Sequence, residues 1–397
     1  MPDRKKDPRA YAAAVVAGGS PWSALWTFPS MIGAAFLVAW GAEAAEFLIS
    51  QGLALAILAL IQTLPEFAVE AVIAWRAGKD PNMVHLAIAN FTGSLRLLTG
   101  LGWPMIYAVA AFYSRKRRKK ALGEITLHSE HAVEVLGLLP PLAYFIFVWW
   151  KSSLSLIDAA FLTMTYVVYL AVLLRMPVRE ESHDDAEEVP RVSRWALSFQ
   201  GWKRWAAILL LLGGGGVIIF LVAAPFLSSM LGLAVALGMT QFTFIQWVAP
   251  FLSEFPEKTS AFAWARRVTR APVALMNMVS SNINQWGVLS AMLAVIYCWS
   301  AGSTAPLPFD DFQRAEILLT IVQAFLGWIF LASMGLSAYE AAGLFLLWLA
   351  QFCFPHWRHD ILYVYLAWIA VELLLVAIGK KKMPVFREFA KAWRGRR

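Results

Sequence analysis

Charged residues are scarce in this sequence. They make up 15% of its 397 residues, whereas soluble domains average about 25%. Hydrophobic residues make up 59%, and the mean hydropathy is +0.60. So little charge beside so much apolar surface excludes an ordinary soluble domain, and we expect an integral membrane protein.

Cysteine and histidine are also few. The two cysteines, Cys298 and Cys353, both lie in apolar segments, which argues against a disulfide framework and against a thiolate metal site. The six histidines are scattered, mostly in or near loops. No nucleophile–base arrangement can be recognised among them, so we expect neither an enzyme nor a resident cofactor.

Basic residues are present in excess, and their placement explains the net charge of +8. They gather at 115–120, at 264–270 and in the C-terminal tail, between or after apolar stretches. This is the positive-inside pattern of membrane proteins, so nucleic acid is not needed as a partner. We expect a multi-pass protein of the bacterial cytoplasmic (inner) membrane, in contact with lipids and inorganic cations. The oligomeric state has no signature in the sequence.

Apolar stretches long enough to span a bilayer recur along the whole chain. A span needs about 20 apolar residues, and this rule predicts about eleven transmembrane helices in an all-α polytopic protein. The predicted spans are 29–48, 52–77, 82–113, 131–150, 153–175, 205–228, 232–264, 271–299, 314–333, 337–354 and 360–379.

Two pairs of these segments resemble each other. "LIQTLPEF" aligns with "FLSEFPEK", which sets Pro65-Glu66 on Pro256-Glu257, and "ANFTGS" aligns with "MNMVSS", which sets Asn90 on Asn277 and Ser94 on Ser281. By the span count the paired helices cross in opposite directions. Inverted repeats with interrupted helices are typical of transporters, and the interruptions point to the binding site.

The repeats divide the chain into two transmembrane halves joined by a polar linker. The predicted organisation is an N-terminal segment (1–28), a first half (29–175) with repeat 1 (52–110), a cytoplasmic linker (176–204), a second half (205–379) with repeat 2 (232–297), and a basic cytoplasmic tail (380–397).

Each Pro-Glu pair interrupts what would otherwise be a buried helix. A proline inside a helix leaves a backbone carbonyl without its donor, and such a group inside a bilayer must be satisfied by something else. Both helices should therefore kink or unwind at Pro65 and Pro256. We expect the two helices to cross with Glu66 and Glu257 facing one another.

Polar side chains share a helix face with each glutamate. Thr63 precedes Glu66 by three residues, and Ser253 and Glu254 precede Glu257 by four and three. Two opposed faces of this kind form a cage of oxygen ligands. Calcium takes 6–8 oxygens and tolerates irregular geometry, whereas nothing here suits a softer metal.

These motifs resemble those of the sodium/calcium exchanger family, within the calcium:cation antiporter superfamily. Its hallmarks are G-T-S-L-P-E on one helix and G-N-x-x-G-S-N-x-x-N/D on the next, once per repeat. The corresponding segments here are "LIQTLPEF" with "IANFTGSLRLL", and "FLSEFPEK" with "MNMVSSNINQW". The resemblance implies a ten-helix inverted-repeat core plus one extra span. It also implies exchange of a divalent cation, Ca2+, for Na+ or H+.

The family's ligand positions can be carried over one by one. The carboxylates expected to bind the metal ion are Glu66, Glu257 and Glu254, where Glu254 is an addition to the family pattern that should favour a divalent ion over a single sodium ion. The other implied ligands are Gln62, Thr63, Ser253, Ser94, Ser281 and Gln285, while Leu98 replaces a ligand; the implied supporting residues are Asn90, Asn277, Asn282 and Arg96. Burial disfavours a charged carboxylate, so an empty site can hold protons on Glu66 and Glu257.

Arg96 allows two interpretations. A membrane-centre arginine costs about 2.5–3.5 kcal/mol and is normally paired. It lies about 200° round the helix from Ser94, so a salt bridge facing away from the site, to Glu43, Glu46 or Glu70, is one interpretation. The other is an internal cation that competes with the transported ion.

Some features have a simpler explanation than a site. His128, His131 and Glu134 share a helical face next to a basic loop, which predicts a solvated helix start. The acidic residues between 180 and 188 lack EF-hand spacing, which predicts a solvated linker. The Pro-Glu segments could also form a buried polar network without a ligand, and a non-transporting scaffold or ion sensor remains the alternative function.

Overall fold

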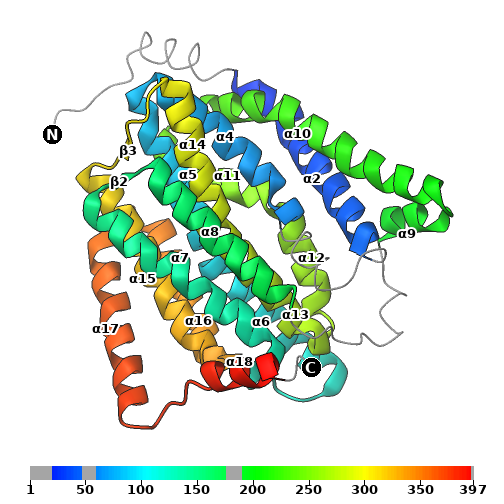
Figure 1. Cartoon of the computed structure of the whole chain (residues 1–397), viewed down its shortest axis with the longest axis vertical. Helices are drawn as coiled ribbons and strands as arrows, with labels where there is room; N and C mark the ends of the chain where they lie inside the picture. The colour runs from blue at the N-terminus through cyan, green and yellow to red at the C-terminus, as the bar shows by residue number, and fades with distance from the viewer. Residues whose placement is uncertain (1–19, 47–59, 176–189, 395–397) are drawn as a thin grey trace.

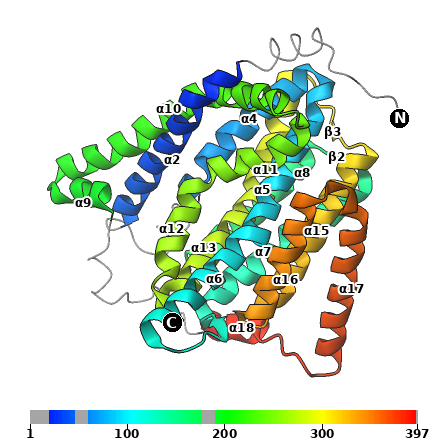
Figure 2. The same cartoon turned by 180° about the vertical axis from the view of Figure 1, so that it is seen from behind.

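The computed structural model describes residues 20–46, 60–175 and 190–394, and helices that run side by side account for most of them (Figures 1 and 2). The first half contains α2 (Ala24–Glu46), α4 (Leu64–Lys79), α5 (Val84–Leu97), α6 (Trp103–Tyr113), α7 (Ala132–Lys151) and α8 (Leu156–Leu173). The second half contains α9 (Arg191–Ser198), α10 (Trp202–Ala236), α11 (Gln241–Ser253), α12 (Phe255–Ala265), α13 (Ala271–Asn284), α14 (Ser290–Ala301), α15 (Asp311–Leu331), α16 (Ala338–Cys353), α17 (Arg358–Ala377) and α18 (Val385–Arg394).

Seven helices in the described residues are long and apolar enough to cross a membrane. They cover Pro21–Ala45, Pro81–Arg117, Ser129–Lys151, Leu156–Leu173, Trp202–Ala236, Asp311–Leu331 and Pro355–Ala377, and α16 is a shorter apolar helix. The predicted start of the second span (52–59) and the acidic run lie outside the described residues. The predicted spans 205–228 and 232–264 differ from the structure, because α10 continues to Ala236 and the next helix begins at Gln241.

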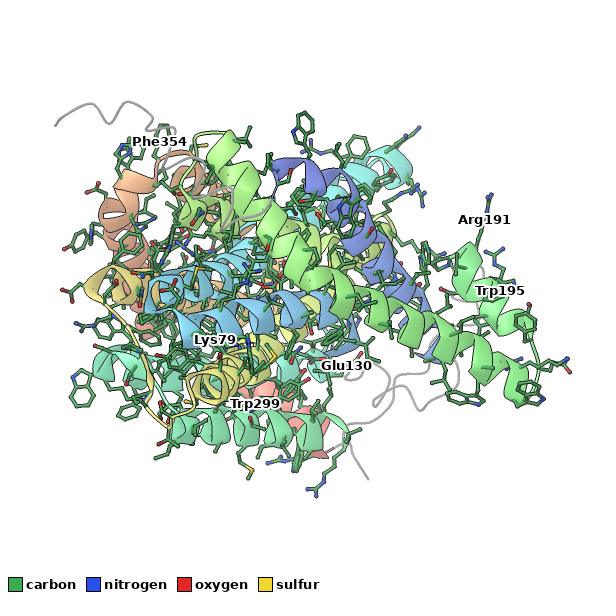
Figure 3. The ribbon with its side chains drawn as sticks, turned by 90° about the horizontal axis from the view of Figure 1, so that it is seen from above. Lys79, Glu130, Arg191, Trp195, Trp299 and Phe354 are labelled. Carbon is green, nitrogen blue, oxygen red and sulfur yellow. The ribbon has the colours of Figure 1, made fainter. Side chains whose placement is uncertain are left out.

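The longest helix, α10, packs lengthwise on α2. Glycine allows the close approach at two points, since a Cβ on Gly41 would lie 2.9 Å from Leu212 and one on Gly215 would lie 2.7 Å from Val38. A buried hydrogen bond of 2.7 Å joins Thr27 to Ser229. The pair leans away from the other helices, and α9, marked by Arg191 and Trp195 in Figure 3, lies at its far end.

The two repeats contain the same succession of elements. In the first, the 3-10 turn η2 (Pro81–Met83) leads into α5, which passes through the π-helix η3 (Leu98–Gly102) into α6. In the second, η7 (Val268–Arg270) leads into α13, and the π-helix η8 (Gln285–Leu289) leads into α14. Both α5 and α13 have 14 residues and both π-helices have 5. Asn90 and Asn277 therefore occupy the same position in their helices.

Two short strand pairs join the halves. β1 (Glu124–Thr126) pairs antiparallel with β4 (Gly335–Ser337), and β2 (Ser153–Leu154) pairs antiparallel with β3 (Leu307–Pro308). β1 and β2 flank α7, while β3 and β4 flank α15. Helices α7 and α15 pack together, so they are joined by strands at both ends.

Candidate cation site

Both Pro-Glu helices are interrupted, two residues before the proline in each case. Residues 60–62 are helical, Thr63 forms a turn, and α4 begins at Leu64. In the second repeat α11 ends at Ser253, Glu254 forms the turn, and α12 begins at Phe255. Each proline thus stands in the first turn of a new helix, where its missing N–H costs nothing. The predicted interruptions are present, and they fall at Thr63 and Glu254 rather than at the prolines.

Glu66 lies at the start of α4 and has no exposed surface. The Asn90 side-chain amide on α5 donates to Glu66 Oε1 over 2.7 Å, and the Ser253 hydroxyl at the end of α11 donates to Oε2. The same Asn90 amide donates its second proton to Glu70 over 2.6 Å. One asparagine therefore bridges two buried carboxyl groups, and Ser253 connects the first repeat to the second.

Glu254 stands in the second turn and is also buried. Its Oε1 accepts from the Ser94 hydroxyl and, over 2.8 Å, from the Gln285 amide in η8. Its Oε2 forms an ion pair with Lys258, one turn along α12. Ser94 comes this close because Gly93 lets α5 press against α11, where a Cβ would lie 1.8 Å from the Gln246 carbonyl oxygen.

Glu257 differs from the other two carboxylates. It is 1% exposed, and neither of its oxygens makes a hydrogen bond of ordinary geometry in the described structure. The Ser281 hydroxyl on α13 lies close enough to act on it as a donor. Buried amide oxygens without a donor also occur on neighbouring residues: Gln285, Asn284 and Asn90. Buried polar atoms are normally satisfied, so this concentration of bare oxygens is what a cation would need.

Three asparagines on α13 have different roles. The Asn277 amide donates to Gln62 over 3.2 Å, and the Asn284 amide donates to Thr63 over 2.6 Å, so both join the repeats across the interruption. The Asn282 amide donates to Thr99 in η3 over 3.3 Å and so joins the repeats outside the interruption. The hydrogen bonds therefore link Gln62 to Asn277 and Thr63 to Asn284 at the interruption, and Asn282 to Thr99 away from it.

Three residues near the glutamates were not predicted. Lys258 follows Glu254 by four residues, a spacing that favours helical ion pairs and that could have revealed it. Glu70 follows Glu66 at the same spacing. Asn284 had no such signal, because its role depends on how α13 is turned towards Thr63.

Two of the predicted partners of Arg96, Glu43 and Glu70, are wrong. Its guanidinium pairs with Glu316 on α15, donates to Gln351 over 3.0 Å, and lies 5.1 Å from the Trp247 ring centre. Arg358 on α17 pairs with the same Glu316 carboxylate. Arg96 does face away from Ser94 as expected, but α11, α15 and α16 cover that side of α5.

Glu43 and Glu70, two of the expected partners of Arg96, are engaged elsewhere. Ser193 and Ser260 donate to Glu43 over 3.2 and 3.3 Å, and Glu70 accepts from Asn90. The side chain of Glu46, the third, lies outside the described residues. The structural salt bridge is therefore present with another carboxylate.

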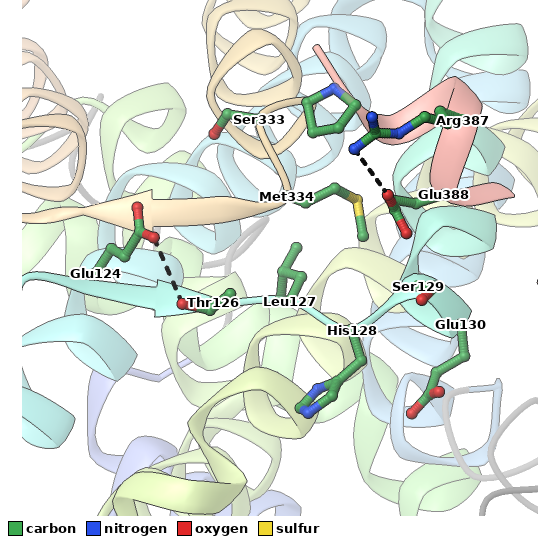
Figure 4. Close-up of a pocket in the computed structure, with 11 residues that line it drawn as sticks. Glu124, Thr126, Leu127, His128, Ser129, Glu130, Ser333, Met334, Arg387 and Glu388 are labelled. Carbon is green, nitrogen blue, oxygen red and sulfur yellow. Dashed lines mark hydrogen bonds and ion pairs between the residues drawn. The ribbon is translucent and has the colours of Figure 1, made fainter. Parts of the chain in front are cut away.

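The histidines before α7 are only partly solvated. His128 is exposed, but His131 and Glu134 are each 8% exposed, because α18 packs against this turn. The expected solvated helix start is therefore wrong for these two residues. Ligand atoms of His128, Glu130 and His131 lie within 4.8 Å of one another. In Figure 4, His128 and Glu130 line one side of a pocket, with Arg387 and Glu388 on the other.

Comparisons with known proteins agree on one family. The family profile described as "Sodium/calcium exchanger protein" matches residues 19–175 and 207–356. A crystal structure of the H+/Ca2+ exchanger CAX is 30% identical, covers 98% of this chain and 94% of its own, and superposes with a TM-score of 0.82.

The structure of the sodium-calcium exchanger NCX_Mj soaked with Na+ and Ca2+ is 17% identical, covers 83% of this chain and 96% of its own, and has a TM-score of 0.54, which shows a shared fold. No curated protein sequence matches significantly.

Proposed function

The chain belongs to the sodium/calcium exchanger protein family, and from this premise we propose that it exchanges Ca2+ for protons across the membrane, with Glu66 and Glu257 as the acids that bind either ion. The observation that carries the proposal is the Glu257 carboxylate, buried in the membrane bundle with the Ser281 hydroxyl beside it but without a hydrogen bond of ordinary geometry. A bare buried carboxylate is costly, and a cation or a proton removes that cost.

The proposed ligands lie on both sides of the two interruptions. We assign the charge to Glu66 and Glu257 and the neutral ligand oxygens to Thr63, Gln62, Ser253, Ser94, Ser281 and Gln285. Calcium accepts this mixture of carboxylate, amide and hydroxyl oxygens. Two carboxylates are neutralised equally by one divalent ion or by two protons. Alternate occupancy of one site by two ions is the basis of antiport.

The proton is proposed as the counter-ion on the strength of the likeness to the H+/Ca2+ exchanger, which extends over nearly the whole of both chains. Sodium ions are the competing candidate within the same family. A non-transporting sensor would bind Ca2+ at the same carboxylates without moving it. Flux measurements separate these three possibilities.

The test is Ca2+ uptake into proteoliposomes that contain the purified chain. We expect uptake when the vesicle interior is more acidic than the medium, no uptake without a pH gradient, and release of internal protons as Ca2+ enters. Uptake driven only by internal Na+ would identify sodium as the counter-ion. Absence of uptake under every gradient, in protein that still binds Ca2+, would contradict transport.

A further inference from the structure

A lysine lies inside the candidate cation site. Lys258 on α12 is 5% exposed, and its ammonium pairs with Glu254. Its charge also acts on Glu66 and Glu257. A positive charge is therefore present beside Glu254, among the acids of the candidate cation site.

The first repeat has no such charges at the equivalent positions. The alignment of Glu66 on Glu257 sets Thr63 on Glu254 and Phe67 on Lys258. A neutral pair in one repeat is thus replaced by an acid and a base in the other, and the two new charges cancel. Because the charges of Lys258 and Glu254 cancel, the net charge of the site equals the sum of the charges on Glu66 and Glu257.

Packing does not explain the pair. A buried ion pair can often be replaced by apolar residues without loss of stability. Here the surroundings are built for a cation. Besides Lys258, the Glu254 carboxylate meets Ser94 and Gln285, and Gln285 Oε1 has no donor of its own.

We propose that the Lys258 ammonium is a tethered cation that fills a monovalent-ion position beside Glu254. By filling that position it excludes Na+ and leaves Glu66 and Glu257 to the transported divalent ion. The inference rests on the proposed function, and it adds the residue that determines ion specificity. Oxygen ligands of Glu254, Ser94 and Gln285 would hold Na+ if the lysine were absent.

The test uses a cycle of charge variants in the full-length protein. Lys258→Gln removes the tethered cation and leaves Glu254 free. Glu254→Gln with Lys258→Gln removes both charges and keeps the side-chain volumes. Lys258→Arg keeps the charge and serves as the matched control. Ca2+ uptake is driven by an acidic vesicle interior, with external Na+ or choline at equal ionic strength.

We expect Na+ to leave the apparent KM for Ca2+ unchanged in the wild type, in Lys258→Arg and in the double variant. In Lys258→Gln, Na+ should raise the apparent KM on the order of tenfold. A wild-type protein that is inhibited by Na+ as strongly as Lys258→Gln would overturn the proposal. So would a double variant as sensitive to Na+ as the single one.

A binding measurement keeps this test independent of transport. A ligand that binds only the folded state raises its stability, so we expect Na+ to raise the melting temperature of Lys258→Gln in detergent but not that of the wild type or the double variant. If Na+ stabilises Lys258→Gln but no variant transports Ca2+, the proposed function is contradicted and the role of Lys258 is supported. If Ca2+ is transported but Na+ does not stabilise Lys258→Gln, the proposed function is supported and the role of Lys258 is contradicted. If Lys258→Gln fails to fold in choline, folding should be recovered in Na+.

Discussion

The two repeats have the same backbone and different charges. Their second helices match in length, continue through π-helices of equal length, and place Asn90 and Asn277 at the same position. The acids in these repeats have different surroundings, because Glu66 accepts two hydrogen bonds, whereas Glu257 lies beside the Ser281 hydroxyl without a hydrogen bond of ordinary geometry. The second helices are thus alike in the two repeats, whereas the electrostatics differ. The first repeat holds its acid with donors, and the acid of the second is the one that we propose to depend on the ion.

Neutralising either acid should have the largest effect. Glu66→Gln and Glu257→Gln each remove one of the two charges that balance a divalent ion, so we expect Ca2+ exchange in proteoliposomes to fall to the level of empty vesicles. Survival of exchange in both variants would show that these residues are not the transport acids.

The difference between the two repeats should also appear in the thermal stability of Glu66→Gln and Glu257→Gln in Ca2+-free buffer. Glu66→Gln keeps the acceptor for Asn90 and turns the other oxygen into a donor, for which the Ser253 hydroxyl must become the acceptor. Hydrogen bonds to a charged group are then replaced by neutral ones, a loss of about 1 kcal/mol. Glu257→Gln removes a carboxylate that has no hydrogen bond of ordinary geometry, so it should leave the melting temperature unchanged or raise it. Equal destabilisation by the two substitutions would contradict the difference between the repeats.

The next effect concerns a charge that only the first repeat has. Arg96 aligns with Ile283, and Arg96→Ile would leave Glu316 with one buried cation fewer. Breaking a buried ion pair costs about 3–5 kcal/mol, so thermal inactivation in detergent should be much faster. The apparent KM for Ca2+ should stay as in the wild type, because Arg96 faces away from the glutamates. Ile283→Leu is the matched control, and a large change in KM for Arg96→Ile would indicate an ion-competing role instead.

The asparagines should give a smaller difference. Asn90 donates to two carboxyl groups, whereas Asn277 donates to a neutral amide. Hydrogen bonds to charged groups contribute about 1.5–3 kcal/mol and neutral ones about 0.5–1.5 kcal/mol. Asn90→Ala should therefore raise the KM for Ca2+ at least about tenfold, and Asn277→Ala should raise it less. The reverse order would mean that Asn277 serves the ion more directly than Asn90.

Sidedness should be measurable without any functional loss. From the density of Lys and Arg we predict that the C-terminal tail lies in the cytoplasm and the acidic loop around Ser303 outside. Cysteines introduced at the exposed positions Ser303 and Arg394 should react with impermeant reagents from opposite sides of the membrane, with exchange unchanged. Labelling of both from one side would contradict the span count on which the inversion of the repeats rests.

The parts of the site that were predictable from the sequence are those encoded locally. A proline followed by a glutamate inside an apolar stretch predicts an interrupted helix with a buried acid, and it occurs twice. The salt bridge of Arg96 was not predictable in detail, because Glu316 is remote in sequence and the packing of α15 brings it close.

The helix boundaries show the same limit. The predicted span ended at Ser228, whereas α10 continues to Ala236, and the Ser229 hydroxyl is satisfied within the helix by donating to the Phe226 carbonyl over 2.8 Å. The π-helices at Leu98 and Gln285 have no recognisable sequence signal. The two π-helices are recognised as equivalent only when the repeats are compared with each other.

The strand pairs restrict how this molecule could move. Main-chain hydrogen bonds at both ends of α7 and α15 prevent these two helices from sliding along or tilting against each other without breaking a strand pair. Helix α7 of the first half and helix α15 of the second half therefore form one rigid unit. Among the described helices, α2 and α10 are not joined by a strand pair, so this constraint does not act on them.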